Sequence, residues 1–344
     1  MVNKNFSDIA KNLVIGVVGA GFAAHYRIRG LQSIFKDKLK INGIFDVSQK
    51  NALAFSKEFL TKQYRSLEEI CSDKDINTIC VCTPSKYHYE IIKTALNNYK
   101  NIICEYPLVV KYEDAEELVK LANNNHLFIH VGQTMNYDED RKIIIANKGK
   151  LGKLFMGYKY MCFGEADSWF EPTGYENIGR WYTNRNETGG WIITSHYHGI
   201  QLFRKVFGEV LSVSGVDSST EKVAAGSILL RHIGGSSSVV QWGMPILGKS
   251  FNITIVSGSK GSIEINDNNY IIHTSEVYEK GQLLGGNSTY VSVFGQDSKN
   301  LHDVLTGKKE MASEITDMLR NLKIAIYADK AARTGKVIDF FQNL

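Results

Sequence analysis

The sequence predicts an α/β protein of about two domains, on the evidence of its length, its composition and an alternation of strand and helix patterns. A chain of 344 residues corresponds to about two domains at roughly 150 residues each. Hydrophobic residues make up 43% and charged residues 22% of the chain, the composition of a globular protein with a large core. High apolar content and low net charge together exclude a disordered chain.

The charge pattern and the cysteines narrow the class of partner and the compartment. The net charge is +4, and no run of Lys and Arg forms the basic patch that nucleic-acid binding requires. The most apolar early stretch, residues 13–24, is shorter than the roughly 20 residues that span a bilayer, and the start lacks a signal-peptide pattern. The five cysteines are scattered without a Cys-x-x-Cys pair. We therefore expect a cytoplasmic protein without a nucleic-acid or membrane partner.

The first half alternates apolar strand patterns with helical spacing. Strands are predicted at residues 13–18, 41–45, 76–81, 101–104 and 127–131, and helices at residues 24–31, 52–60, 87–96 and 113–122. The first strand is a continuous apolar run, as in parallel strands buried on both faces. Pro84 ends the third strand pattern because proline cannot donate to a continuing ladder. Such alternation predicts a doubly wound parallel sheet with right-handed crossovers.

A glycine pattern joins the first strand to the first helix. Gly19-x-Gly21-x-x-Ala24 is the G-x-G-x-x-[GA] fingerprint in the strand–turn–helix context that it requires. Gly19 permits the tight turn, Gly21 allows a pyrophosphate to approach the backbone, and Ala24 lets the helix pack closely on the sheet. The phosphates then lie on the N-terminus of the helix, next to Phe22 and Ala23. The pattern predicts a dinucleotide-binding Rossmann domain.

Asp46 ends the second strand, near the spacing of about 20 residues at which the ribose-binding acid is expected. Its carboxylate accepts ribose hydroxyls and repels a 2′-phosphate, so it favours NAD over NADP. Ser48 and Lys50 lie close enough to accommodate a phosphate, so NADP remains open.

The second half contains mainly strand patterns in which one face is exposed to solvent. Strand patterns occur at residues 153–163, 210–215, 225–232, 236–241, 251–257 and 261–265. Residues 189–207 and 315–332 have helical spacing. The strand pattern is typical of an antiparallel sheet.

Several segments in matching order resemble the glucose–fructose oxidoreductase/inositol dehydrogenase (Gfo/Idh/MocA) family. They are residues 16–24, Asp46, Cys82-Thr83-Pro84-Ser85-x-x-x-His88, Cys104-Glu105-Tyr106-Pro107-Leu108, Thr188-Gly189-Gly190 with His198, and residues 325–337. The resemblance covers almost the whole chain. It implies a Rossmann domain over residues 1–135 and a C-terminal α/β domain over residues 136–344, with an open, mostly antiparallel sheet.

The resemblance also implies positions for ligands and subunits. Thr83, Pro84, His88 and Glu105 are expected at the cofactor. The second domain is expected to supply the substrate pocket and an oligomer interface, giving a homodimer or homotetramer. Its helix at residues 315–332 is expected to pack back on the first domain.

Two positions depart from the family pattern. Tyr106 stands where many members have the lysine of Glu-Lys-Pro, and Thr194 stands where many have the aspartate of Asp-x-x-x-His. His198 keeps the histidine of that pattern. Glu-Tyr-Pro is also the form found in biliverdin reductases of the same broad family, although those tend to lack the Gly-Gly segment followed by histidine.

The candidate catalytic residues are His198 and Tyr106. A histidine has a reference pKa of about 6.5 and can exchange a proton near neutral pH; the alternative is a hydrogen-bonded structural histidine. A tyrosine, with a reference pKa of about 10, can donate a hydrogen bond or a proton to a developing alkoxide. Tyr106 follows a strand, at the edge of the sheet where cofactors bind.

Substrate contacts are expected from Thr194, Arg185, Trp181 and Asn136. Aromatic side chains beside arginines suit a sugar ring, although an aromatic core with solvated arginines remains open. His196 and His198 lie two residues apart, about 200° around a helix, and no carboxylate motif completes a site. We therefore expect no metal.

The sequence predicts an NAD(P)-dependent oxidoreductase acting on a secondary alcohol or ketone of a sugar, cyclitol or related small molecule. One alternative is reduction of a conjugated C=C or C=N bond, as in biliverdin reductases. A second is an NAD(P)-binding sensor without activity, which the missing lysine and aspartate motivate.

Overall fold

The computed structural model describes residues 6–162, 184–220, 223–244, 250–283 and 288–340. The described residues form two compact units. The first contains residues of 1–134 and 290–320, and the second contains residues of 135–289 and 321–344. The first division falls between residues 134 and 135, and residues 290–320 belong to the first unit.

The first unit contains a six-stranded parallel sheet in the order β3-β2-β1-β4-β5-β6. The strands are β1 (Leu13–Val18), β2 (Leu39–Phe45), β3 (Lys62–Gln63), β4 (Thr78–Val81), β5 (Asn101–Cys104) and β6 (Ile129–Val131). The order reverses between β1 and β4, and this switch point is where ligands bind in open α/β sheets. The doubly wound parallel sheet is confirmed.

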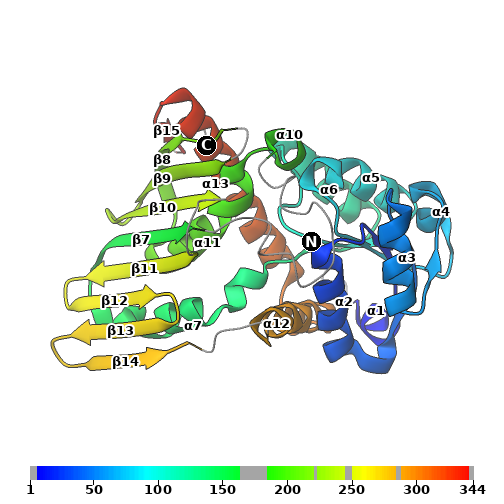
Figure 1. Cartoon of the computed structure of the whole chain (residues 1–344), viewed down its shortest axis with the longest axis horizontal. Helices are drawn as coiled ribbons and strands as arrows, with labels where there is room; N and C mark the ends of the chain where they lie inside the picture. The colour runs from blue at the N-terminus through cyan, green and yellow to red at the C-terminus, as the bar shows by residue number, and fades with distance from the viewer. Residues whose placement is uncertain (1–5, 163–183, 221–222, 245–249, 284–287, 341–344) are drawn as a thin grey trace. The chain divides into compact units, whose positions relative to one another are not determined.

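Seven helices of the described chain accompany this sheet. They are α1 (Ser7–Lys11), α2 (Phe22–Phe35), α3 (Gln49–Glu58), α4 (Leu67–Ser72), α5 (His88–Asn97), α6 (Tyr112–Asn124) and α12 (Ser288–Leu305). Helices α2 and α12 lie side by side (Figure 1), and a Cβ on Gly30 would lie 2.7 Å from the carbonyl oxygen of Phe294. Leu31 and Phe35 of α2 share one apolar core with Leu301 of α12.

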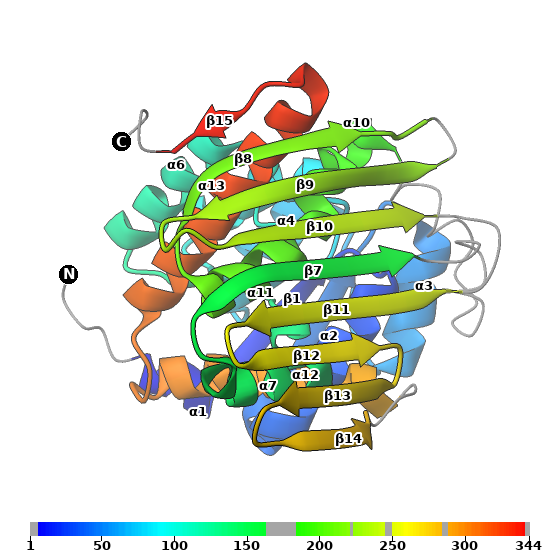
Figure 2. The same ribbon diagram turned by 90° about the vertical axis from the view of Figure 1, so that its left-hand side faces the viewer.

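The second unit contains a nine-stranded sheet in the order β14-β13-β12-β11-β7-β10-β9-β8-β15. The strands are β7 (Leu154–Cys162), β8 (Val210–Asp217), β9 (Ala224–His232), β10 (Ser237–Met244), β11 (Phe251–Gly258), β12 (Gly261–Asn266), β13 (Asn269–Thr274), β14 (Tyr278–Gln282) and β15 (Ile338–Asp339). Only β7 and β10 pair in parallel, so the expected open, mostly antiparallel sheet is confirmed. Figure 2 looks onto this sheet.

The helices of the second unit cover one face of its sheet. They are α7 (Glu139–Asn147), α10 (Arg185–Thr188), a π-helical turn (Ile192–His196), α11 (Tyr197–Phe207) and α13 (Met311–Thr334), which begins in the first unit. Short 3-10 turns occur at Lys36–Lys38, Ser85–Tyr87, Thr134–Tyr137 and Lys148–Leu151. The expected helix at residues 189–207 is regular only from Tyr197, because a Gly-Gly turn and the π-helical turn precede it.

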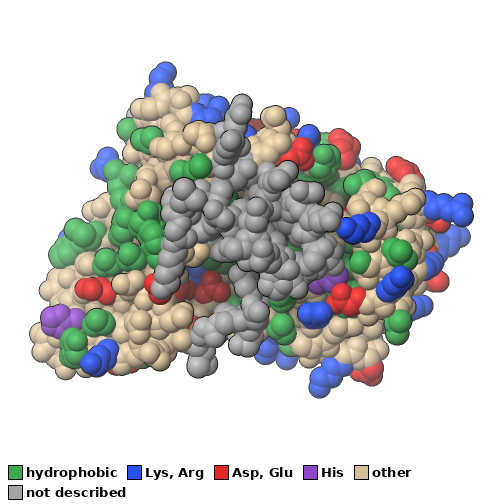
Figure 3. Space-filling view, in the orientation of Figure 1, with side chains coloured by type: hydrophobic (Ala, Val, Ile, Leu, Met, Phe, Trp, Pro, Cys, Tyr) green, Lys and Arg blue, Asp and Glu red, His purple; other side chains and the backbone are tan. Residues whose placement is uncertain are grey.

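The opposite face of the nine-stranded sheet carries an apolar row. Leu229 of β9 pairs with Val239 of β10, Val239 with Tyr158 of β7, and Tyr158 with Ile255 of β11. In Figure 3, hydrophobic side chains gather along the side of this sheet.

Candidate functional site

Gly19 lies between β1 and α2 in a conformation that other residues rarely adopt. Its φ is +92°, and a Cβ there would lie 2.7 Å from the carbonyl oxygen of Cys82. Its N–H donates to the carbonyl oxygen of Phe45 at 2.9 Å. The fold therefore requires glycine at this position of the fingerprint.

Gly21 is the N-cap of α2, and the end of this helix suits an anion. No side chain caps the helix, and its first turn contains no acidic residue. Among the described residues, a Cβ on Gly21 would meet no atom within 4 Å, so these residues leave space above the helix N-terminus. Phe22 and Ala23 form the half-buried first turn, and Ala24 is fully buried. This arrangement fits a pyrophosphate held by backbone N–H groups.

Asp46 directly follows β2, and its carboxylate is fixed beside the glycine turn. One oxygen, Oδ2, accepts from the N–H of Ala20 at 2.7 Å, and Oδ1 accepts from the N–H of Ser48 at 2.7 Å. The residue remains half-exposed. Each carboxylate oxygen keeps a second acceptor position, so Asp46 can also accept a ribose hydroxyl.

The segment after β4 provides a further polar atom for a cofactor. The hydroxyl oxygen of Thr83 is buried and has no hydrogen-bond partner among the described residues. A buried hydroxyl without a partner is unfavourable, and a bound polar ligand would satisfy it. With the open space at Gly21 and the carboxylate of Asp46, this hydroxyl shows that the residues present fit NAD.

His88 holds the loops after β4 and β5 together. Its Nε2 lies 2.8 Å from the carbonyl oxygen of Thr83, and its Nδ1 lies 2.9 Å from that of Pro107. Burial lowers the pKa of His88. Its imidazole therefore contacts the backbone, and Pro84, directly after Thr83, precedes the turn that leads into α5.

Glu105 takes part in a buried ionic network that sequence reasoning missed. Its Oε1 accepts from Nε of the fully buried Arg27 at 2.6 Å. The Arg27 guanidinium also pairs with Asp297 of α12. Asp297 accepts further from Nε2 of His130 and from the N–H of Gln133, both at 3.1 Å.

The charges in this network offset the burial of Asp297. Burial alone would raise the pKa of this carboxyl, but the positive charge of Arg27 and the contact with His130 hold it well below its ordinary value. The network joins α2, the end of β5, β6 and α12. It fixes Glu105, the residue before Tyr106. Tyr106 itself lies half-buried just after β5.

His198 lies in the first turn of α11, in the second unit. Its ring stacks on that of Trp242 with centroids 6.1 Å apart, and Tyr197 meets it edge-on at 5.8 Å. Burial, together with the positive charges of Arg141 and Lys159, lowers the pKa of His198 well below 6.5. The imidazole is therefore uncharged at neutral pH, which is the form in which a histidine can accept a proton.

Thr194, at the position of the family aspartate, lies in the π-helical turn. It is 6% exposed. Its hydroxyl oxygen lies 3.3 Å from the carbonyl oxygens of both Gly190 and Trp191, so its single hydrogen can be donated to either of them. While that hydrogen is donated to the backbone, the hydroxyl oxygen can still accept a hydrogen bond from a substrate.

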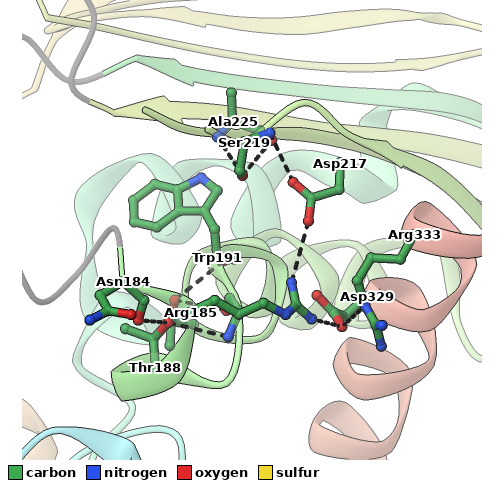
Figure 4. Close-up of polar contacts among 11 residues, drawn as sticks. Asn184, Arg185, Thr188, Trp191, Asp217, Ser219, Ala225, Asp329 and Arg333 are labelled. Carbon is green, nitrogen blue, oxygen red and sulfur yellow. Dashed lines mark hydrogen bonds and ion pairs between the residues drawn. The ribbon is translucent and has the colours of Figure 1, made fainter. Parts of the chain in front are cut away.

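Arg185 is held by two carboxylates (Figure 4). Its Nη1 lies 3.3 Å from Oδ2 of Asp217, and its Nη2 pairs with Asp329 of α13, which also accepts from Nε of Arg333 at 3.0 Å. A Cβ on Gly190 would lie 2.7 Å from Oδ1 of Asp329. The structure thus shows Arg185 fastening the Gly-Gly turn to α13, and its expected contact with substrate stays a prediction.

The remaining expected substrate residues are Asn136 and Trp181. Oδ1 of Asn136 accepts from Nζ of Lys205 at 3.1 Å. Trp181 lies outside the described residues.

Metal sites and membrane-spanning helices are two other features to consider among the described residues. No group of three or more His, Cys, Asp or Glu side chains in these residues could hold a metal ion. In the same part of the chain, no helix has the length and apolar character needed to cross a membrane. His196 contacts the same indole as His198, with ring centroids 6.3 Å apart, and its Nε2 lies 2.8 Å from the carbonyl oxygen of Gly226.

Comparison with known proteins agrees with this fold. An uncharacterized oxidoreductase of Streptococcus pneumoniae is 22% identical over 343 aligned residues, covering 85% of this chain and 87% of that protein. Biliverdin reductase from Synechocystis, solved with biliverdin and NADP+, has a TM-score of 0.81 at 20% identity, covering 93% of this chain and 99% of that one. Levoglucosan dehydrogenase, solved with NADH and L-sorbose, has a TM-score of 0.76 at 17% identity, covering 96% of this chain and 99% of that one. At such identities the structural likeness shows the fold.

Residues 13–133 match the oxidoreductase family with an NAD-binding Rossmann fold, GFO_IDH_MocA. The matched segment contains the parallel sheet, the glycine turn and Asp46. Residues 13–133 thus resemble the NAD-binding Rossmann domain of this oxidoreductase family, and the chain as a whole is similar to an oxidoreductase.

Proposed function

We propose that the protein transfers a hydride between NAD and a secondary alcohol or ketone of a sugar, cyclitol or related small molecule. The observation that carries this proposal is His198, an imidazole that is uncharged at neutral pH and follows the Gly-Gly turn. Levoglucosan dehydrogenase, a dehydrogenase of the same fold solved with NADH and a sugar, supports the substrate class.

Each residue of the site has its own role in the proposed reaction. When bound, NAD would supply the redox chemistry, as the acceptor of the hydride from the carbinol carbon. His198 accepts the hydroxyl proton as the carbonyl forms, which balances the charge that the hydride removes. Tyr106 donates a hydrogen bond to the substrate oxygen. Gly19, Gly21 and Asp46 hold the cofactor.

The proposal is tested by measuring cofactor binding and turnover together. NAD is expected to bind more tightly than NADP, because Asp46 repels a 2′-phosphate. Asp46→Asn is expected to reduce that preference, as measured by fluorescence titration with both reduced cofactors. A panel of sugars, cyclitols and alditols is expected to yield a substrate. Tighter binding of NADP by the wild-type protein would contradict the assignment of NAD.

One observation favours a second candidate, the reduction of a conjugated C=C or C=N bond. Glu105-Tyr106-Pro107 takes the form found in biliverdin reductases, and a solved biliverdin reductase shares the fold. Titration with a linear tetrapyrrole and excess reduced cofactor distinguishes the two reactions, because the second predicts a change in the visible spectrum. Tight cofactor binding without turnover of either class would instead indicate a sensor.

We also propose a homodimer or homotetramer formed through the apolar row of the nine-stranded sheet. Leu229 in this row is 40% exposed, and contiguous exposed apolar surface of this kind marks protein interfaces. Sedimentation velocity is expected to show the oligomer for the wild type and smaller species for Leu229→Lys. Leu53→Lys, at a similarly exposed leucine of α3, is the control. A monomeric wild type at micromolar concentration would contradict the proposal.

The thiols support the proposed cytoplasmic location. All five cysteines are free and buried. Burial raises the pKa of Cys71 to about 12, so its thiol stays protonated. Such residues behave as small core side chains in a reducing compartment.

A further inference from the structure

Three charged side chains are buried between the helices and the sheet of the second unit. Asp140 and Arg141 of α7 are 5% and 3% exposed, and Lys159 of β7 is 0% exposed. The Lys159 ammonium contacts Oδ2 of Asp140 at 3.2 Å, Oδ1 of Asn252 at 3.2 Å and Oγ1 of Thr254 at 3.1 Å. These three acceptors match its three hydrogens, and the charge of Asp140 opposes the burial that lowers the pKa of Lys159.

The guanidinium of Arg141 extends from this group to α11. Its Nη2 donates to the carbonyl oxygen of His198 at 2.6 Å, and its Nη1 donates to Oε1 of Gln201 at 3.3 Å. Arg141 thus holds two residues that are one helical turn apart. Oδ1 of Asp140 accepts from the N–H of Arg141 at 2.6 Å, which fixes the start of α7 on the same group.

An apolar contact would hold α7 and α11 together at a smaller desolvation cost than this charged group. Burying charges removes their hydration, and well-packed apolar residues often stabilise such a site equally well. Two cations here face two carboxylates, those of Asp140 and Asp138. Burial and the charge of Asp140 raise the pKa of Asp138 to about 7. Buried charges with perturbed pKa values cluster at functional sites, so this group suggests a functional task.

The imidazole of His198 is within electrostatic reach of this group. Arg141 from α7 and Lys159 from β7 both act on its charge, and Tyr197 is its titratable neighbour on α11. Trp242 of β10 contributes an uncharged ring. Both cations disfavour a protonated imidazole, as does burial.

We propose that Arg141 is a positioning residue of the reaction, which anchors the turn that carries His198 and, with Lys159, directs two positive charges toward its imidazole. The inference rests on the proposed role of His198. It adds two cations that, after burial, disfavour the protonated imidazole of His198.

NMR titration of the intact protein with ring-¹³C histidine tests this inference without any substrate. The signal lost in His198→Asn identifies His198. In the wild type it is expected to stay neutral well below pH 6.5. Arg141→Gln is expected to raise its midpoint by about one unit or more, since a nearby cation is lost, and Lys159→Met is expected to act in the same direction. Arg141→Lys, which keeps the charge, is expected to restore most of the low midpoint.

Arg204→Gln is the matched control. Arg204 is another buried cation of α11, but it pairs with Glu209 and Asn321 and acts on His232. Its replacement is expected to raise the midpoint of His232 and leave that of His198 unchanged. A wild-type His198 that titrates at or above 6.5, or one that is unmoved in Arg141→Gln, overturns the inference. If the midpoint rises but no sugar or polyol is oxidised, the effect of Arg141 on His198 stands, and the proposed function fails together with the role of Arg141 in that reaction.

Where a substrate is turned over, the pH profile gives a second readout. The acid limb of kcat/KM for oxidation is expected to move upward with the NMR midpoint in Arg141→Gln. A purely structural role for Arg141 would lower the plateau without moving the limb.

Discussion

Replacing His198 with alanine is expected to lower turnover by about 10²-fold or more, the usual contribution of a general base. The affinity for NAD is expected to change little, because the residues assigned to the cofactor lie in the first unit and His198 lies in the second. The measurements are steady-state kinetics and a cofactor titration on the same preparation. His232→Ala is the control, since His232 is another buried imidazole, bonded to Gly208 and Ser238. Unchanged turnover in His198→Ala would remove His198 from the mechanism.

The expected pH dependence of turnover follows from the imidazole of His198. Its pKa is lowered well below 6.5 by burial and by Arg141 and Lys159, so the base form predominates at neutral pH. The rate of oxidation is expected to stay level from neutral pH down to 6.5. Reduction requires the protonated form and is expected to accelerate as the pH falls.

Arg27→Met is expected to lower the free energy of unfolding by about 3–5 kcal/mol, because removing one partner leaves buried carboxylates without their cation. Asp297 is buried and loses the Arg27 contact, and Glu105 loses its bond to Nε. Urea unfolding measures the change. The double variant Arg27→Met/Asp297→Asn is expected to recover part of the loss, since it removes the unpaired charge as well.

Arg29→Met is the matched control on the same helix. Arg29 pairs with Glu58 at the surface, with side chains 51% and 33% exposed, and such pairs contribute less than about 1 kcal/mol. Equal losses in the two variants would contradict the role assigned to the buried network. Because the pKa of Asp297 is depressed, its contribution is present above the unfolded-state pKa and is lost as the pH falls toward the folded-state value.

Much of the first unit could be predicted because its signals are local. The run at Leu13–Val18, the turn at Gly19 and the spacing to Asp46 lie within one continuous stretch, and the structure places them together. Helix α12 was missed because Val291 and Val293 near its start favour strands. Its helical form depends on packing, since Val293 and Phe294 are buried and Phe294 meets Gly30 of α2.

The charged networks could not be predicted, because their partners are remote in sequence. Arg27 follows a helical pattern in which an arginine is normally exposed, and its carboxylate partners lie 78 and 270 positions away. Lys159 stands in a strand pattern, and its partners Asn252 and Thr254 lie 93 and 95 positions away. Residue type alone marks neither side chain as buried.

Isotope transfer tests the central claim, hydride transfer to NAD, most directly. Sugars, cyclitols and alditols deuterated at their carbinol carbons are incubated with the protein and NAD+, and the nicotinamide product is analysed by mass spectrometry. The proposed dehydrogenase predicts NADH that carries one deuterium at C4, formed much more slowly by His198→Ala. Tight binding of NAD+ without deuterated NADH from any of these substrates would contradict it.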